Sequence, residues 1–528
     1  MTPSFSNPRL SQMPSFLPTA IVRSSLRTRF SVLVRASATV WLCFLGLCGT
    51  PSLRAHVGNP HIVFEGRAGG FPVRVVVRQP DVVPGLAEVS VRVLEGTPQR
   101  ITVLPLHWDA ARKGAPAPDI ARLTPGETHL YAAQLWLMTR GAYGVEVSLE
   151  GDRGGSVIVP VNSVAYDRKP MPAAMKTITG VLGLVLALGI VAIGFAGGRD
   201  SDWPVGQEVS SQQRRRGVVG AVTGVVLVCL AVVGGNRWRV SEDAFHTSRV
   251  LFKPIAHRVD VAESSEGARL ELQFTDPRMG HPNFALVPDH GKLVHAFLIG
   301  GASNSVFAHV HPLHLKGNAF QARLPALPAG TYRFFADVTH EQGIAETITN
   351  EIHVARALAD SGPPSDPDDS FSTSPLSLGD EVELAGGVRM KLSGSAALRS
   401  GISDVLEASL TDAQGHPVAL QPYLRMLGHA VIERIDGGVF SHVHPAGTLS
   451  MAAARGFAAK SGGAVAAKNA DATCGDLSAL PEEQVLALGR GGKVGFPFVF
   501  PSAGEYAVWV QVKVDGRILT GAFRRTAR

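Results

Sequence analysis

The chain has 528 residues, of which 45% are hydrophobic and 18% are charged, and its formal net charge is +6. This length predicts several domains rather than a single core. The net positive charge is spread over the N-terminal leader, one short loop and the C-terminal tail, without the interleaved aromatic residues of a nucleic-acid-binding stripe, so we expect no nucleic-acid partner.

Residues 1–55 have the features of a secretory signal peptide or of an N-terminal anchor. Several arginines precede the apolar residues 36–48, and Ala55 offers a cleavage site. Two outcomes are open: cleavage after Ala55, or retention of the segment as an anchor. Cleavage would make His56 the first residue, where its amino group and its ring can chelate copper together.

Residues 56–172 alternate apolar and polar side chains between Pro-Gly turn signals, as in the run VSVRV at residues 89–93. Such alternation is typical of strands with one buried face. We therefore predict that this segment is an exported β-sandwich of the immunoglobulin-like (Ig-like) kind.

Two uncharged apolar stretches follow, at residues 177–198 and 217–235. Each is close to the roughly 20 residues that cross a bilayer, and neither has the polar stripe of a core helix. We predict two transmembrane helices that anchor the chain in a lipid bilayer. If the leader exports the first domain, residues 199–216 form a cytoplasmic loop. The expected location is the cytoplasmic (inner) membrane, with most of the chain in the periplasm or at the cell exterior.

The part of the chain beyond the second span is duplicated. Residues 246–357 and 379–528 share four blocks in the same order, which include a His-x-His-Pro motif and a Gly-x-Tyr block. We call these segments the first copy and the second copy. Residues 358–378 are polar and proline-rich and are predicted to be a linker. The Ala/Gly-rich residues 452–494 of the second copy are predicted to be a mobile excursion that adds little core.

A Gly-x-Tyr block also occurs in the first domain, so Tyr143, Tyr332 and Tyr506 each precede an alternating strand. The pattern is typical of the tyrosine corner of Ig-like sandwiches, in which the ring packs and the hydroxyl reaches the backbone. The predicted fold class is therefore mainly β. It comprises three Ig-like β-sandwich domains, two transmembrane helices and an N-terminal signal or anchor.

The His-x-His-Pro motifs are the strongest candidates for a functional site. Residues i and i+2 of a strand project from one face, so each motif presents two imidazoles together. In the second copy, an Asp-Gly turn that pairs Ile435 with Gly438 would place His429 opposite His444, with His442 on the diagonal. Three imidazoles would then converge.

The first copy offers the equivalent set His295, His309 and His311. It has one more residue before the motif, so a bulge or an odd-length loop must restore the shared face. Further candidate ligands lie nearby, namely His290 and His340 in the first copy and Met426 and Met451 in the second.

Three imidazoles with an open position suit copper or zinc, and neighbouring thioethers favour copper. We therefore expect copper as the cofactor, with zinc as the alternative. A competing interpretation is a structural ladder of hydrogen-bonded histidines, which needs no ion.

The leader, the histidine near the mature terminus, the Ig-like alternation and the adjacent spans together resemble the periplasmic copper-resistance sandwich proteins and their membrane-fused relatives. The resemblance is architectural and covers residues 1–240. It implies a copper site in the first domain, but the late aspartate and histidine pair of that family is approached only by His107 and Asp109. The His-x-His-Pro copies are similar to segments of uncharacterised bacterial exported proteins.

These features favour a non-enzymatic protein that buffers, senses or delivers copper. A copper-dependent oxygenase and a purely structural or partner-binding Ig-like protein are the alternatives, and the question of enzymatic activity stays open. The expected partners are the metal ion, the bilayer, and a metallochaperone or another envelope protein.

Overall fold

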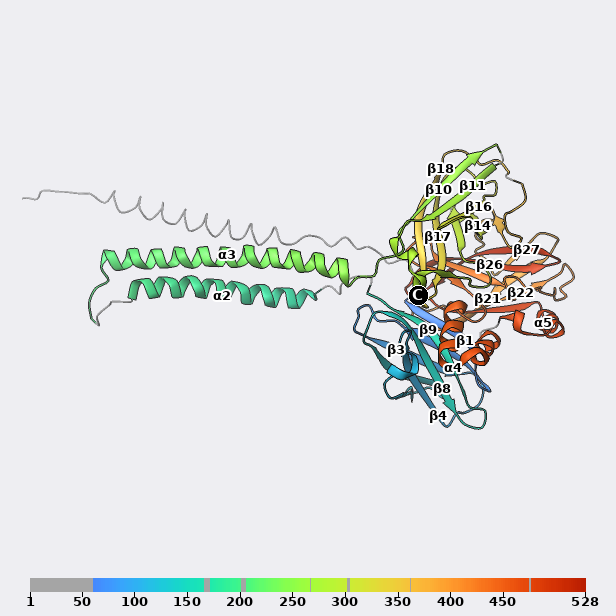
Figure 1. Ribbon diagram of the computed structural model, residues 1–528, viewed down its shortest axis with the longest axis horizontal. Helices are drawn as coiled ribbons and strands as arrows, with labels where there is room; N and C mark the ends of the chain where they lie inside the picture. The colour runs from blue at the N-terminus through green and yellow to red at the C-terminus, as the bar shows by residue number, and fades with distance from the viewer. Residues whose placement is uncertain are drawn as a thin grey trace, which may run out of the picture. The chain divides into compact units, whose positions relative to one another are not determined.

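The computed structural model describes residues 60–165, 171–200, 206–265, 267–301, 304–360, 362–473 and 476–528. In this part the chain is mainly β: six sheets form three pairs, as predicted, and two long helices belong to none of them (Figure 1). His56 and the predicted leader lie outside the described residues.

The first domain is a sandwich of two antiparallel sheets, with strand orders β1-β2-β3-β7-β6 and β5-β4-β8-β9. The predicted alternation is present, since Val73, Val75 and Val77 are buried between the sheets. The strands are β1 (His61–Ala68), β2 (Phe71–Arg78), β3 (Gly85–Val93), β4 (Arg100–His107), β5 (Asp119–Ile120), β6 (Arg122–Leu123), β7 (Leu130–Leu137), β8 (Gly141–Glu150) and β9 (Gly155–Ser163).

The two helices α2 (Ala173–Asp200) and α3 (Ser211–Arg249) contain the predicted spans. Both are long and apolar enough to cross a membrane, and their apolar side chains are exposed instead of packed in a protein core. They approach each other through glycines, since a Cβ on Gly194 would lie 2.5 Å from the carbonyl oxygen of Gly220. Small residues allow this close backbone approach between helices in a bilayer.

The first copy is a second sandwich, with one sheet of order β10-β11-β16-β15 and another of order β12-β17-β13-β14-β19, in which β18 also pairs with β17. Its strands are β10 (His257–Ser264), β11 (Gly267–Phe274), β12 (Leu286–Val287), β13 (His295–Gly300), β14 (Val306–Val310), β15 (Leu313–His314), β16 (Ala319–Arg323), β17 (Gly330–His340), β18 (Ala345–Val354) and β19 (Ser370–Ser372).

The second copy is a third sandwich, with sheets of order β20-β21-β22-β25 and β24-β23-β26-β27. Its elements are β20 (Glu381–Glu383), β21 (Arg389–Ser393), β22 (Ser403–Thr411), β23 (His429–Arg434), β24 (Phe440–Val443), α4 (Met451–Thr473), α5 (Glu482–Gly489), β25 (Lys493–Val499), β26 (Gly504–Val514) and β27 (Arg517–Ala527).

The tyrosine corners occur in all three domains, as predicted. The hydroxyls of Tyr332 and Tyr506 each donate to the carbonyl oxygen four residues earlier, at 2.7 Å. The hydroxyl of Tyr143 accepts the backbone N–H of Thr139 at 3.3 Å. The three rings are buried, so each corner both packs and satisfies a polar group.

The two copies pack against each other through the sheets that carry the histidine motifs. Alternate residues of β13 and β23, such as Ala296 and Ala430, face the interior of their own sandwich. The intervening residues face the other copy and form a separate apolar cluster, made of Phe297, Ile299, Phe307, Phe335, Val431, Phe440, Ala507, Trp509 and Ala522. Both faces of these sheets are therefore buried, which explains why β13 is a continuous run of buried residues.

Two predictions about the connecting segments are wrong. The polar segment between the copies is more than a linker, because β19 pairs with β14 and Asp366 is only 6% exposed. The excursion of the second copy begins as helix α4, whose residue Phe457 is buried and packs edge-on against Trp108 of the first domain. In both places neighbouring domains provide the burial that the local composition lacks.

Candidate metal centre

Six histidines from the two copies meet at this interface. We call His295, His309 and His311 the first triad, and His429, His442 and His444 the second triad. All six are buried, and within each triad the ligand nitrogens lie within 4.8 Å of one another.

The hairpin of the second copy has the predicted register. Ala430 pairs with Val443, so the next pair along the ladder is His429 with His444, and their ring centroids are 5.0 Å apart. The predicted two-residue turn is wrong. The N–H of Gly437 donates to the carbonyl of Arg434, which closes the turn one residue earlier without changing the register.

In the first copy, an odd number of residues between the two strands keeps the three histidines on one face. This is one of the two solutions predicted, the other being a bulge. Ala296 pairs with Val310, so His295 is opposite His311 at the next position. Gly300 pairs with Val306, so five residues of the sequence separate the two strands. Both hairpins therefore place three imidazoles on the face that meets the other copy.

The first triad is oriented by hydrogen bonds on its outer side. Nδ1 of His295 lies 3.4 Å from Nε2 of His309, so these two nitrogens point at each other. The opposite nitrogens bond to acceptors: His295 to the backbone oxygen of Asp289 at 3.0 Å, His309 to Oε1 of Gln511 at 2.9 Å, and His311 to Oδ1 of Asp369 at 3.0 Å. Acceptors of this kind fix the tautomer of histidine ligands in metal sites.

The second triad repeats the inner contact, since Nδ1 of His429 lies 3.0 Å from Nε2 of His442. On its outer side, Nδ1 of His442 is 3.5 Å from Oδ2 of Asp337. Two nitrogens bound to one ion at roughly 2.0–2.1 Å lie about 2.9–3.4 Å apart for angles between square and tetrahedral. The inner contacts of both triads have this spacing.

The outer partners are exchanged between the copies. Asp337 is the ladder partner of His295 in the first copy, and Gln511 is the ladder partner of His429 in the second. These equivalent positions act across the interface: Gln511 holds His309, and Asp337 lies against His442. The two copies thus face each other with an approximate twofold relation.

The two triads are neighbours, because the rings of His295 and His442 are 5.1 Å apart. A seventh histidine, His290, joins them and lies 4.3 Å from the ring of His444 and 5.4 Å from that of His429. His290 is buried, and neither of its nitrogens has a hydrogen-bond partner in the part of the chain that the structure describes. Its nearest ion-pair oxygen is Oδ1 of Asp289, at 3.6 Å.

Burial keeps these imidazoles neutral. It lowers the pKa of His295 to about 4 and that of His444 to about 3, because a charged ring would lose its solvation. Burial, reinforced by repulsion from neighbouring rings, also holds the pKa of five others well below the usual value, namely His290, His309, His311, His429 and His442. Neutral imidazole is the form that binds a metal.

Carboxyl groups surround the triads and respond to the same burial. Burial raises the pKa of Asp337 and of Asp369 to about 7, and it also raises the pKa of Asp289. Asp337 is the most accessible of these, with 27% of its side chain exposed. A cation bound nearby would favour the ionised form of these groups, which would then place negative charge next to the rings.

Sequence reasoning missed the residues that support the triads. His311, Asp366 and Asp369 form a third group with ligand atoms within 4.8 Å of one another, and Lys292 bonds both oxygens of Asp366 at 2.6 Å. The aspartates lie in the predicted linker, where an acidic run beside prolines indicated only solvation. Nothing in the local pattern of Gln511 or Asp337 marks either residue as a partner of the opposite copy.

Several candidate ligands have other roles. Nδ1 of His340 is 2.9 Å from the carbonyl oxygen of Phe284 and its Nε2 is 2.7 Å from Oε1 of Glu346, so hydrogen bonds occupy both nitrogens. Met426 and Met451 belong to the apolar cluster that includes the core of the first domain. Nε2 of His107 lies 3.3 Å from the carbonyl oxygen of Arg140.

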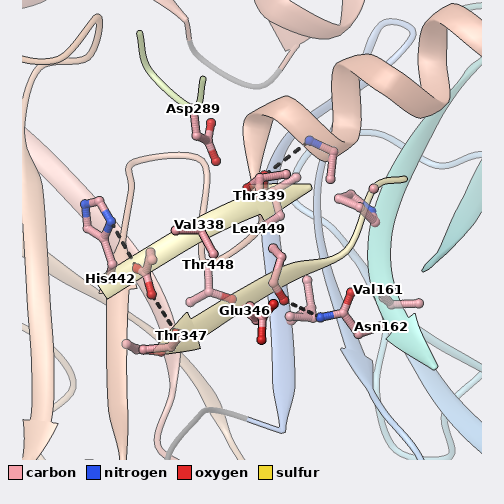
Figure 2. A pocket seen from close by; sticks show the side chains of 18 of the residues that line it. Val161, Asn162, Asp289, Val338, Thr339, Glu346, Thr347, His442, Thr448 and Leu449 are labelled. Atoms are coloured by element: carbon pink, nitrogen blue, oxygen red, sulfur yellow. Dashed lines mark hydrogen bonds and ion pairs between the residues drawn. The ribbon is translucent and has the colours of Figure 1, made fainter. Parts of the chain in front are cut away.

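A cavity of about 530 Å³ reaches the histidines from the junction of the three domains. Its wall includes His290, His295, His442 and His444, and also Asp289. Figure 2 shows Val161 and Asn162 of the first domain, Thr339 and Glu346 of the first copy, and His442 of the second copy around this space. A small molecule or ion in the cavity would therefore lie next to both triads.

A structural ladder explains only part of this arrangement. In the pair His429 with His442, one ring can donate to the other, as a ladder requires. In the pair His295 with His309, the outer nitrogen of each neutral ring donates to an acceptor, so no proton remains for the inner contact of a ladder. A ladder also leaves both nitrogens of His290 and Nε2 of His311 buried without a partner among the described residues. Each such group costs about 1–3 kcal/mol, a cost that a metal bond would remove.

A family model described as a domain of unknown function, DUF8832, matches residues 382–528, which is almost the whole second copy. No curated protein matches the chain. The comparison therefore marks the second copy as a recurring unit without assigning it an activity.

The chain is also similar to several solved structures. These include latent PorU from Porphyromonas gingivalis (9% identity, TM-score 0.15, 91% of this chain and 35% of that chain), bacterial invasin, an integrin-binding protein (10%, 0.13, 86% and 60%), and a putative membrane anchored protein from Corynebacterium diphtheriae (9%, 0.12, 87% and 92%). At these TM-scores the similarity carries no argument. The resemblance to copper-resistance proteins gains no support from these matches.

Proposed function

We propose that this protein is a membrane-anchored, extracytoplasmic metal-binding protein that holds copper between its two duplicated sandwiches. The observation that carries this proposal is the convergence of seven buried, neutral imidazoles, some of whose nitrogens lack any partner among the described residues. Outer hydrogen bonds orient every ring of the first triad, which is the arrangement that prepares histidines to bind an ion.

Copper is favoured because the site is built from imidazole. Divalent ions bind nitrogen sites in an order that peaks at copper, and neutral imidazole suits both copper and zinc. Because Met426 and Met451 lie in an apolar cluster, the proposal depends on the histidines alone. Zinc is the alternative ion, and competition between the two metals decides between them.

A role in copper buffering, resistance or delivery fits the predicted export and the two helices that can cross a membrane. In that role the ion would be exchanged with a metallochaperone or another envelope protein. A second candidate function is a copper-dependent redox enzyme. The cavity of about 530 Å³ beside four of the histidines favours it, because it offers space for a small substrate.

The proposal is tested on the full-length protein in detergent, loaded separately with copper and with zinc and measured by elemental analysis. We expect tight copper binding in the wild type and its loss when His309 and His442 are both replaced by alanine. His416→Ala is the matched control, because this ring is 77% exposed and lies outside the triads. Negligible copper in the wild type, or equal copper in wild type and double variant, would overturn the proposal.

The enzymatic alternative needs a second measurement on the loaded protein. Oxygen consumption in the presence of a reductant is expected to stay at the level of the double variant if the protein only stores or delivers copper. Consumption well above that level would favour the redox enzyme.

A further inference from the structure

The turn that precedes each triad has a position at which only the first copy carries a histidine. A tight turn precedes each first histidine: Asp289 and Lys292 exchange backbone hydrogen bonds in the first copy, and Tyr423 and Met426 do so in the second. The second residue of each turn has a positive φ, +50° at His290 and +49° at Leu424. His290 is therefore the counterpart of Leu424.

His290 lies against the triad of the opposite copy. Its ring is 4.3 Å from His444 and 5.4 Å from His429, whereas it is 6.1 Å from His295. Within the triads the ring centroids are between 4.5 and 5.7 Å apart. His290 thus lies beside two rings of the second triad, at centroid distances close to those between the members of that triad.

Each triad also has the spacing of a separate ligand set. The inner nitrogens are 3.4 Å apart in the first triad and 3.0 Å apart in the second, which is the spacing of two ligands on one ion. Six imidazoles exceed the four positions of a tetrahedral ion, so a single ion cannot bind both triads completely.

We propose, on the basis of the proposed function, that the interface holds two neighbouring ions in non-equivalent sites. His429, His442, His444 and His290 form a closed site of four imidazoles. His295, His309 and His311 form an open site of three imidazoles, because the equivalent of His290 in the second copy is Leu424, which brings no nitrogen.

The different numbers of imidazoles predict that the two ions are held with different permanence. A closed set of four protein ligands is typical of a permanently bound ion, whereas three ligands leave a position for water or an exogenous molecule. The cavity is lined by His295 of the open site and by His290, His442 and His444 of the closed site, so both sites lie at its wall. The free position of the open site makes it the one at which an ion is exchanged or a small molecule binds.

The test is a copper titration of the full-length protein followed by competition with chelators of graded affinity. We expect two ions per chain, released in two steps. His290→Leu should weaken the tighter step by about tenfold or more while leaving the weaker step unchanged. Leucine suits the change because Leu424 already occupies the equivalent turn at the same φ.

His314→Leu is the matched control, because this histidine belongs to the same copy and is exposed. A complementary variant, His295→Gln, should remove only the weaker step. If His290→Leu lowers the melting temperature of the metal-free protein, pulsed electron paramagnetic resonance of the copper-loaded wild type replaces it. Three imidazole nitrogens at one ion and four at the other are expected.

The outcomes separate this inference from the function on which it rests. One ion per chain, or an equal weakening of both steps by His290→Leu, would overturn the two-site arrangement and leave copper binding intact. No bound copper in the wild type would overturn both.

Discussion

The two copies have nearly the same hairpins but are surrounded by different residues. Each copy has a tight turn, a strand that begins with histidine, a His-x-His motif and a tyrosine corner. They differ at His290 and Leu424 in the turn, and at Asp337 and Gln511 on the neighbouring strand. The comparison indicates that duplication kept the ligand-bearing strands and varied the residues that set the properties of each site.

A second difference lies in how the copies hold each other. Phe307 stacks on Trp509, and the equivalent pair in the other direction, Phe440 and Phe335, stacks at 4.1 Å. Arg333 of the first copy forms an ion pair with the fully buried Glu433 of the second. The equivalent positions on the other side, Ile299 and Ala507, are apolar. The approximate symmetry is thus kept by the aromatic residues and broken by one ion pair.

Acidification should have the largest effect on this interface in the metal-free protein. The imidazoles have a pKa near 6.5 when unfolded and far lower values when folded, about 4 for His295 and about 3 for His444. Below about pH 6.5 the unfolded chain takes up protons that the folded protein does not, so the free energy of unfolding falls. The full loss for one histidine is about 1.4 kcal/mol for each unit by which folding lowers its pKa.

The measurement is urea unfolding of the metal-free protein from about pH 7 to about pH 5. All seven histidines take up protons only when the protein unfolds in this range, so the loss of unfolding free energy should exceed that from any single substitution. In His290→Leu, one histidine fewer takes up a proton, so the free energy of unfolding should fall less steeply with decreasing pH. A free energy of unfolding that stays constant over this range would contradict the expectation.

Trp509→Ala tests the aromatic contact between the copies. The side chain is fully buried and stacks on Phe307 at 5.0 Å, so we expect a loss of about 4 kcal/mol. Thermal and urea unfolding measure the change. Trp136, which is 61% exposed, is the control, and its replacement by alanine should change stability by less than about 0.5 kcal/mol. Equal effects of the two substitutions would show that the interface is not formed.

Arg333→Ala tests the single ion pair that breaks the symmetry. It leaves Glu433 buried without its partner, so we expect a loss of about 3 kcal/mol. Arg356→Ala, which removes an exposed pair with Glu263, should cost less than about 1 kcal/mol.

A double variant sharpens this test. Arg333→Met with Glu433→Leu imitates the apolar side of the interface and should recover most of the stability, because well-packed apolar residues can replace a buried ion pair. If the double variant is as unstable as Arg333→Ala, the loss of stability does not come from the unpaired charge of Glu433 alone, which would contradict this expectation.

Replacing the residues that contact the outer nitrogens of the triads should have the smallest effects. Each substitution should change the metal affinity of the triad in the other copy. Gln511→Ala removes the acceptor of His309 and should lower the copper affinity of the first triad by about 10–100-fold. Asp337→Asn should weaken the second triad by a similar or smaller factor, because its contact with His442 is longer, at 3.5 Å. Chelator competition measures both, and an effect confined to the triad of the same copy would contradict the exchange of partners.

The local sequence was sufficient for the strands and for the triads. Alternation predicted the sandwich faces, and the Gly-x-Tyr blocks predicted corners in which Tyr332 and Tyr506 bond to the backbone. The parity of the hairpins predicted that His429 faces His444, because the register depends on the number of residues between them even though the turn itself is of another type.

Only the tertiary structure decided what the triads face. A strand pattern shows that side chains share a face but not whether that face meets solvent, a core or another domain, so the sequence left separate and shared sites equally open. The partners Gln511 and Asp369, and the role of His290, depend on the contact between the copies and on the fold of the segment that connects them. That contact is made by residues far apart in the chain, and their complementarity exists only once both sandwiches have formed.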